Sequence, residues 1–397
     1  MSTRISIQGA TRCARITCIV TLAVNTLSVA LTALSALFAG ASVLYAQDSR
    51  LPERRLTAQP SARWTEPMSE IAGVRELSDG RVIVLDSREQ RLSLVDLATG
   101  VALPVGRRGQ GPGEFSRALR LLPLPGDSTL VVDGGAARLL VIGGDGVPIG
   151  ILTSLGPSAK EAGLGPVALR DVDVVQGAYF QGRAGRMTET GFEQPDSARI
   201  LRFDRRTGHI DSLVNVALPL SKVTIARQGQ TITSVNVVRP PFSVGDEWTV
   251  GDDGRVVIAR RSPYRLDLVS RDLRVMRGAA VPAEERRVEA SDRTEYLAQL
   301  ANGASLDPAT LDWPERMPLF LPGAVIAVPN GETWVRRTSA AGASTVRHDV
   351  FDALGQRVAE VLTAASRRIV LVTARGVYVA RTDDDGLQYL ERFAMPR

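Results

Sequence analysis

The stretch DGRVIV at residues 79–84 decides the fold, because the same short pattern returns along the chain. In each copy a tight turn is followed at once by a short strand-like segment. Asp-Gly and Asn-Gly adopt the positive φ angles that the two-residue turn of a β-hairpin requires. The further copies are GDSTLVV at 126–132, QGAYF at 176–180, DGRVVI at 253–258, NGETWV at 330–335 and RGVYV at 375–379.

Each copy has further strand-like segments on both sides. An apolar run precedes it, as at 71–77, and a third segment that often begins with Arg follows it, as at 91–96 and 138–142. Several copies have a fourth short segment, as at 274–276. Three or four short antiparallel strands, repeated six times, are typical of the blades of a β-propeller. We therefore predict an all-β fold, a six-bladed β-propeller. The alternative, a β-sandwich, does not require the same order of turns and strands six times.

Two insertions interrupt the repeat on either side of its fourth copy. Residues 221–241 are predicted to form an extra hairpin around Gln228-Gly229-Gln230. In the second insertion, 283–322, the part Glu284–Leu300 is charged and contains no Gly or Pro, which predicts a helix, whereas the part after it is rich in Pro and aromatic residues.

The second insertion carries the candidate binding residues Tyr296, Trp313 and Phe320. Insertions of a propeller lie over one end of its channel, where ligands and partners dock. The aromatic side chains are therefore candidates for a binding surface. Packing on the ends of the blades is the alternative, and the sequence favours it.

The N-terminal segment predicts export. It contains Arg4, Arg12 and Arg15, and the chain from Ile16 to Gln47 then carries no charge. This order is typical of a secretory signal peptide, with cleavage expected after Ala46. An uncleaved anchor is the alternative, since the apolar part is long enough to span a bilayer. Either way the arginines place the rest of the chain outside the cytoplasm, so an uncleaved 16–46 would be its only membrane contact.

The remainder, 47–397, is expected to form one domain. Residues 54–64 precede a blade that already has its strands, so we expect them to supply the outer strand of the last blade and close the ring. The basic pI of about 9.6 does not predict nucleic-acid binding, because the arginines after the N-terminal segment are interspersed with Asp and Glu. Both cysteines, Cys13 and Cys18, lie in the N-terminal segment, so the domain can form no disulfide and no thiolate metal site.

The connector GRRGQGPGEF at 106–115 resembles six-bladed propellers of the NHL-repeat type, which include bacterial envelope proteins. The later blades lack this connector. Its glycines do not predict a phosphate-binding loop, because a strand rather than a helix is expected to follow them.

Related propellers include lactonase-like hydrolases that hold a divalent metal in the channel with Glu, Asp and Asn side chains. A hard cation such as calcium needs several converging oxygen ligands. The resemblance therefore makes Glu70, Asp171 and Asp246, near the channel ends of the inner strands, the candidate metal ligands, whereas their residue pattern favours ordinary loop carboxylates. No other cofactor is expected.

No residue is predicted to be catalytic, since His209 and His348 have no recognisable nucleophile motif beside them. The leading interpretation is an exported, non-catalytic module that binds a protein or a small molecule. The alternative is a metal-dependent hydrolase of the lactonase type.

Overall fold

The computed structural model describes residues 51–396 apart from 177, 183–185, 189–190, 194, 230 and 301–310. The contacts divide the chain into two units, Met1–Leu51 and Pro52–Arg397. The predicted signal or anchor segment lies outside the described residues. Within the described ranges, no helix has both the length and the apolar character needed to cross a membrane.

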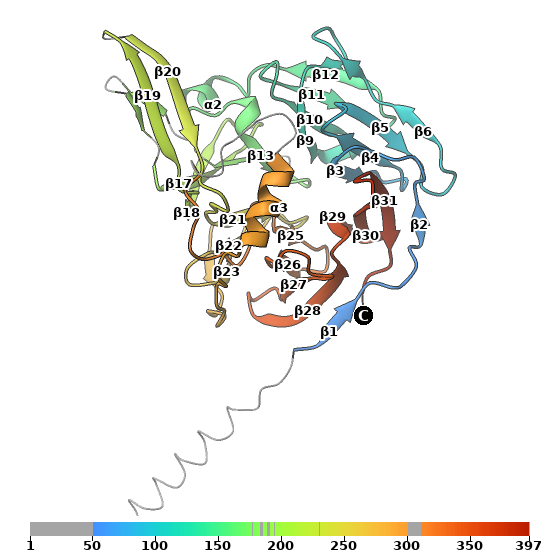
Figure 1. Ribbon diagram of the computed structural model, residues 1–397. Coiled ribbons are helices and arrows are strands. Elements are labelled where there is room, and N and C mark those ends of the chain that lie inside the picture. Colours follow the sequence, from blue (N-terminus) through green and yellow to red (C-terminus); the bar gives the residue numbers. More distant parts are fainter. Residues whose placement is uncertain are drawn as a thin grey trace, which may run out of the picture. The chain divides into compact units, whose positions relative to one another are not determined.

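The second unit is mostly β and has the arrangement of a β-propeller (Figure 1). Within the described residues, five sheets have four strands and one sheet has five. The first three of these sheets are β3 Ile71–Glu76, β4 Val82–Asp86, β5 Arg91–Val95, β6 Ala102–Pro104; β9 Ala118–Pro123, β10 Thr129–Asp133, β11 Arg138–Ile142, β12 Pro148–Leu152; and β13 Leu169–Val172, β14 Tyr179–Gly182, β17 Ser197–Phe203, β18 Ile210–Ala217. The other three are β21 Glu247–Val250, β22 Val256–Arg260, β23 Arg265–Val269, β24 Val275–Arg277; β25 Val325–Ala327, β26 Thr333–Arg336, β27 Thr345–Phe351, β28 Arg357–Ala364 with β1 Glu53–Arg55; and β29 Arg367–Thr373, β30 Gly376–Thr382, β31 Gln388–Phe393 with β2 Ala62–Arg63.

The repeated turn of the sequence joins the first and second strands of each of these sheets. In the first sheet, for example, Gly80 has a φ of +93° between β3 and β4, a conformation that glycine adopts without strain. The third copy of the turn lies partly outside the described residues, at 177. The first strands contact one another in a closed series, in the order β3, β9, β13, β21, β25, β29 and again β3 (Figure 1). In each sheet the strand before the repeated turn is therefore the one that takes part in this closed series.

The N-terminal part of the unit closes the last sheet, as predicted. β2 pairs antiparallel with β31, with Ala62 opposite Arg392. Behind it, Trp64 is buried in the core between the last and first sheets. The closure thus combines a strand pairing with an aromatic anchor.

A second N-terminal strand was not anticipated. β1 pairs in parallel with β28 of the preceding sheet, with Arg54 opposite Val361. Arg54 also forms an ion pair of 2.9 Å with Glu332. The segment before the first repeat therefore holds the outer edges of two sheets rather than one.

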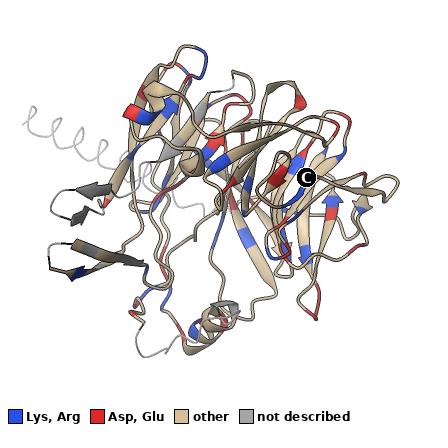
Figure 2. Cartoon of the chain, turned by 90° about the horizontal axis from the view of Figure 1, so that it is seen from above, with Lys and Arg blue, Asp and Glu red and all other residues tan. Residues whose placement is uncertain are grey.

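The core consists of apolar clusters that lie between neighbouring sheets. Between the first two sheets, for example, Leu85, Leu94, Phe115, Val131 and Ile142 are all buried. Successive residues of a strand point to opposite faces of its sheet. The apolar residues of one strand therefore contribute in turn to the clusters on its two sides, as expected for strands packed on both faces. Basic and acidic residues are interspersed over the chain (Figure 2).

The Gly-rich connector joins the first two sheets. β7 Arg107–Arg108 pairs in parallel with β8 Glu114–Phe115, and the strand β9 follows directly. Glu114 accepts a hydrogen bond of 2.8 Å from the backbone N–H of Gly111 and pairs with Arg107. The glycines thus serve a folded connector that is followed by a strand.

The two insertions lie between the third and fifth sheets. The first contains the hairpin β19 Lys222–Gln228 and β20 Thr231–Val238. The helix of the second, α3, spans Ala290–Leu300, so the predicted start at Glu284 is wrong. Residues before α3 are extended instead: Val288 and Met317 share backbone hydrogen bonds with Glu315 and Arg286 across the insertion. This pairing with the Pro-rich part, a tertiary contact, overrides the local helical preference.

The remaining elements are short. They are the helices α2 Pro157–Glu161, η1 Pro125–Asp127 and η2 Pro166–Ala168, and the small hairpin of β15 Arg186–Thr188 with β16 Gly191–Glu193.

Candidate ligand cavity

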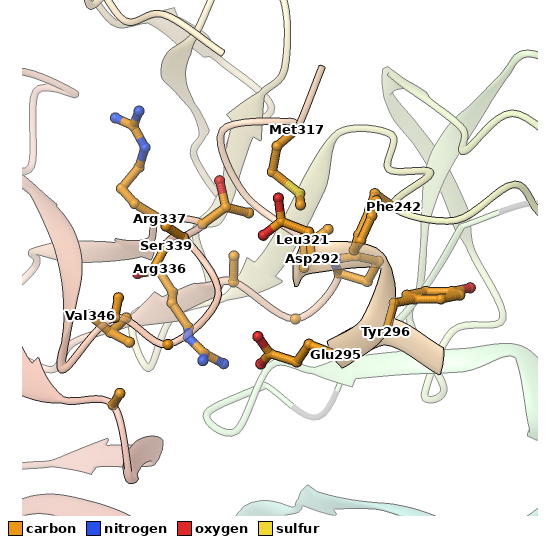
Figure 3. A pocket seen from close by; sticks show the side chains of 18 residues that line it. Phe242, Asp292, Glu295, Tyr296, Met317, Leu321, Arg336, Arg337, Ser339 and Val346 are labelled. Carbon is orange, nitrogen blue, oxygen red and sulfur yellow. The ribbon is translucent and has the colours of Figure 1, made fainter. Parts of the chain in front are cut away.

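A cavity of about 290 Å³ lies between α3 and the segment that follows β26 (Figure 3). We call it the α3 cavity. Its lining combines polar and apolar groups from α3, from the end of β26 and the turn after it, and from the segments at 242 and 317–324. In Figure 1 α3 stands in front of the centre of the propeller.

Asp292 fixes α3 in place. Its carboxylate accepts hydrogen bonds from the backbone N–H of Glu289 at 2.8 Å and from the backbone N–H of Ala341 at 3.2 Å. It also takes a two-pronged contact from Arg286, at 2.6 and 2.7 Å. The contact to Glu289 resembles a capping box, in which an acidic residue of the first turn satisfies an N–H at the start of the helix. These bonds lower the pKa of Asp292, the ion pair with Arg286 most strongly.

Aromatic side chains form one wall of the cavity. The ring of Tyr296 on α3 packs edge-on against Phe242, with centroids 5.0 Å apart, and against Trp313, with centroids 5.5 Å apart. Arg293 lies over the ring of Trp313 at 5.6 Å. The wall thus combines Tyr296 and Trp313 of the second insertion with Phe242, which directly follows the first. Phe242 gave no signal in the sequence because it lies outside the aromatic part of the second insertion.

The three aromatic candidates of the sequence do not stay together. Tyr296 lines the cavity, and Trp313 packs behind it. Phe320 instead is fully buried in the core between the fourth and fifth sheets, 6.0 Å from the ring of Tyr264. The sequence offered a binding surface or packing on the ends of the blades, but Phe320 lies in the core between two sheets.

Four charged side chains line the cavity, and two of them are engaged elsewhere. Asp292 is held as described. Arg337 forms an ion pair of 2.9 Å with the buried Asp349 and donates to the carbonyl of Leu319. Neither has a charge left for a ligand.

The other two are Arg336, from the end of β26, and Glu295, from α3. Figure 3 shows the guanidinium of Arg336 and the carboxylate of Glu295 pointing toward one another across the cavity. Burial lowers the pKa of Arg336, and the nearby charge of Glu295 partly opposes this shift. The cavity therefore presents one positive and one negative group that the described residues leave without an ion pair.

The three candidate metal ligands are not brought together. Glu70 accepts a hydrogen bond of 2.8 Å from the Ser87 hydroxyl. Asp171 is half-buried, and the desolvation of its carboxylate raises its pKa. It accepts hydrogen bonds of 2.6 Å from the Thr249 hydroxyl and 2.8 Å from the Val250 N–H.

Asp246 pairs with Arg260 at 2.8 Å and accepts the N–H groups of Ala217 and Arg261. In the part of the chain that the structure describes, no three side chains of His, Cys, Asp or Glu converge as a metal would need. These carboxylates therefore do not fit a channel metal site of the lactonase type.

Other carboxylates at strand ends have a structural role that recurs with the repeat. Asp86 closes β4 and Asp133 closes β10, and both are fully buried. Each accepts two backbone N–H groups from the segment before the inner strand of its own sheet: those of Ser69 and Glu70, or those of Ser116 and Arg117. A recurring Asp after an apolar strand thus signals a structural bond within the blade.

Neither histidine is among the residues that line the cavity, although His348 lies opposite Arg336 on the neighbouring strand. His209 is exposed beside Asp211, with 3.1 Å between the ring nitrogen and the carboxylate. His348 on β27 is buried; desolvation, aided by the positive charge of Arg336, lowers its pKa to about 4.

Comparisons with known proteins yield similarity in structure alone. No protein-family model and no curated protein matches the chain. Among solved structures, a member of the DUF4221 family from Bacteroides vulgatus is 11% identical, with a TM-score of 0.45, 85% of this chain covered and 94% of the other. A calcium-binding regucalcin from Agrobacterium tumefaciens is 13% identical, with a TM-score of 0.36 and coverage of 87% and 97%.

A gluconolactonase from Xanthomonas campestris is 9% identical, with a TM-score of 0.40 and coverage of 87% and 96%. The structural neighbours are β-propeller proteins. Identities this low transfer no activity to the chain.

Proposed function

We propose that this chain is an exported, six-bladed β-propeller of the NHL-repeat type that binds a ligand in the α3 cavity. The observation that carries the proposal is the pairing of an aromatic wall with two charged groups that are not engaged in ion pairs, inside one cavity. Export is supported by the charge and hydropathy of residues 1–46. The blade count is supported by the closed series of six first strands in the described residues.

The cavity has the features of a small-molecule site. Its volume of about 290 Å³ is at the lower end of the range of about 300–1,000 Å³ that ligand pockets occupy. Such pockets combine apolar walls with a few placed polar groups. We expect a ligand smaller than a drug-sized molecule.

The test is a fragment screen on the purified, exported protein by ligand-observed NMR, repeated with a variant that fills the cavity. Ala340 lines the cavity and is exposed, so Ala340→Trp should fill it without disturbing the core. Ala98→Trp, in an exposed turn outside the cavity, is the matched control. We expect fragments to bind the native protein and the control but not Ala340→Trp. Binding that is unchanged in Ala340→Trp, or no binding at all, would refute the proposal.

The hydrolase alternative stays a prediction from the sequence. The contacts of Glu70, Asp171 and Asp246 give it no support, since each carboxylate is used by a different set of structural partners.

A further inference from the structure

The α3 cavity offers a charge pattern from which a ligand class follows; this step rests on the proposed function. Of its four charged lining residues, Asp292 and Arg337 are held by structural bonds. Arg336 and Glu295 form no ion pair or side-chain hydrogen bond with any residue that the structure describes. They have opposite signs and face each other (Figure 3).

A partly buried guanidinium without an ion pair is costly, because the nearby charge of Glu295 only partly repays its loss of hydration. The local field adds to this need. Arg368 lies on β29, and its pKa is lowered by burial and by the positive charge of Arg336, while Glu70 opposes this shift. Arg368 uses its guanidinium to donate to the carbonyl of Ile71. An anion beside Arg336 would therefore offset the positive charge in this part of the cavity.

A simple anion would, however, meet Glu295 on the opposite side. The carboxylate of Glu295 would repel a second negative group across a small cavity. A ligand that also carries a cation resolves this conflict, because it presents a positive group to Glu295 and a negative group to Arg336. The guanidinium can bind a carboxylate through two parallel hydrogen bonds.

We infer that the α3 cavity binds a small zwitterion, with its carboxylate on Arg336 and its ammonium group on Glu295. A free α-amino acid is the simplest member of this class. The wall formed by Tyr296 and Phe242 would contact the rest of the ligand, so an aromatic or apolar side chain is favoured.

The experiment uses three probes with a common body: L-phenylalanine, 3-phenylpropionate, which lacks the ammonium group, and 2-phenylethylamine, which lacks the carboxylate. Binding is measured by isothermal titration calorimetry on the native protein, R336Q and E295Q. The matched controls are R287Q and E315Q, which remove the same charges from an exposed pair outside the cavity lining. The other common L-amino acids are screened at millimolar concentration in parallel.

We expect L-phenylalanine or another L-amino acid to bind the native protein, and its one-charge analogues to bind at least ~10-fold more weakly, as one lost charge-assisted hydrogen bond implies. R336Q and E295Q should each weaken binding of the amino acid by a similar factor, while R287Q and E315Q leave it unchanged.

Three results would overturn the inference. Equal binding of 3-phenylpropionate and L-phenylalanine, with no effect of E295Q, would identify a plain anion site. Failure of every amino acid would exclude this ligand class. The double variant R336E/E295R exchanges the two charges. If it were as stable as the native protein and neither bound an amino acid, the two residues would form an internal ion pair that closes the cavity. In each case the proposed function would stand if fragments bound the native protein and Ala340→Trp abolished that binding. If no fragment bound the native protein, the proposed function would be refuted as well.

Discussion

The phenol of Tyr378 on β30 donates a hydrogen bond of 2.5 Å to the carboxylate of Glu76 on β3. Both residues are buried, and they belong to the last and the first sheet. Burial and the carboxylate raise the pKa of Tyr378. The ring of sheets is therefore joined by a side-chain bond at the same junction that the pairing of β2 with β31 closes.

Replacing Tyr378 by Phe should weaken this junction. The change removes a hydrogen bond to a charged group and leaves the buried carboxylate of Glu76 with Arg375 at 3.8 Å, so we expect the free energy of unfolding to fall by about 1.5–3 kcal/mol. Urea denaturation measures the loss. Tyr389→Phe is the control, because the ring of Tyr389 on β31 lies against Arg381 of β30. Equal losses in the two variants would contradict the assigned role of the bond.

Deleting residues 54–64 should lower the melting temperature sharply. The deletion removes β2, most of β1 and the buried Trp64, and it exposes the edges of β31 and β28. It also removes Arg63, which lies 2.6 Å from the fully buried Glu391. Circular dichroism against temperature is the measurement. Shortening the β19–β20 hairpin by the same length provides the control, and a deletion that melts no lower than this control would argue against closure by the N-terminal segment.

His348 should make the protein less stable in acid. Its pKa in the folded state is about 4, below the ordinary value of 6.5. Between these two pH values the unfolded chain binds a proton at this residue and the folded protein does not. The contribution is complete above pH 6.5 and is lost as the pH falls toward 4, by about 3 kcal/mol in total. Urea unfolding at pH 7 and pH 4.5 should show a smaller loss in His348→Gln than in the native protein. The exposed His209→Gln should behave like the native protein; identical pH profiles in all three would refute the assignment.

Asp292→Asn should loosen α3. The change weakens the bonds to Arg286, Glu289 and Ala341 that hold the start of the helix against the segment after β26. We expect faster amide exchange in Ala290–Leu300 by hydrogen–deuterium mass spectrometry, with a loss of about 1–2 kcal/mol in local stability. Asp312→Asn, an exposed residue of the same insertion, is the control. Unchanged exchange in α3 would show that other contacts hold it.

Much of the fold could be predicted because its signals are local. The turn at Asp79-Gly80 and its copies are short-range features, and the alternation of apolar residues on strands such as 138–142 needs no distant partner. The start of α3 could not be predicted in this way, because residues 286–288 pair with 315–317 across the insertion.

The candidate site was predicted only in part. Tyr296 was identified because aromatic residues in an insertion stand out by composition. Phe320 shares that composition but is buried in the core, and no local pattern separates the two. Glu70, Asp171 and Asp246 were plausible ligands by residue type. Glu70 instead accepts from the Ser87 hydroxyl, Asp171 from the Val250 N–H, and Asp246 pairs with Arg260.

The sequence by itself determined the strands and their turns, because these depend on neighbours within a few residues. It also predicts the export segment. Only the tertiary structure decided which charges are left unpaired. Arg336 ends a strand and Glu295 lies on a helix of an insertion, and they face each other because the sheet and α3 are packed together. A charge is free for a ligand only if every group around it is already satisfied, and that condition depends on the whole fold.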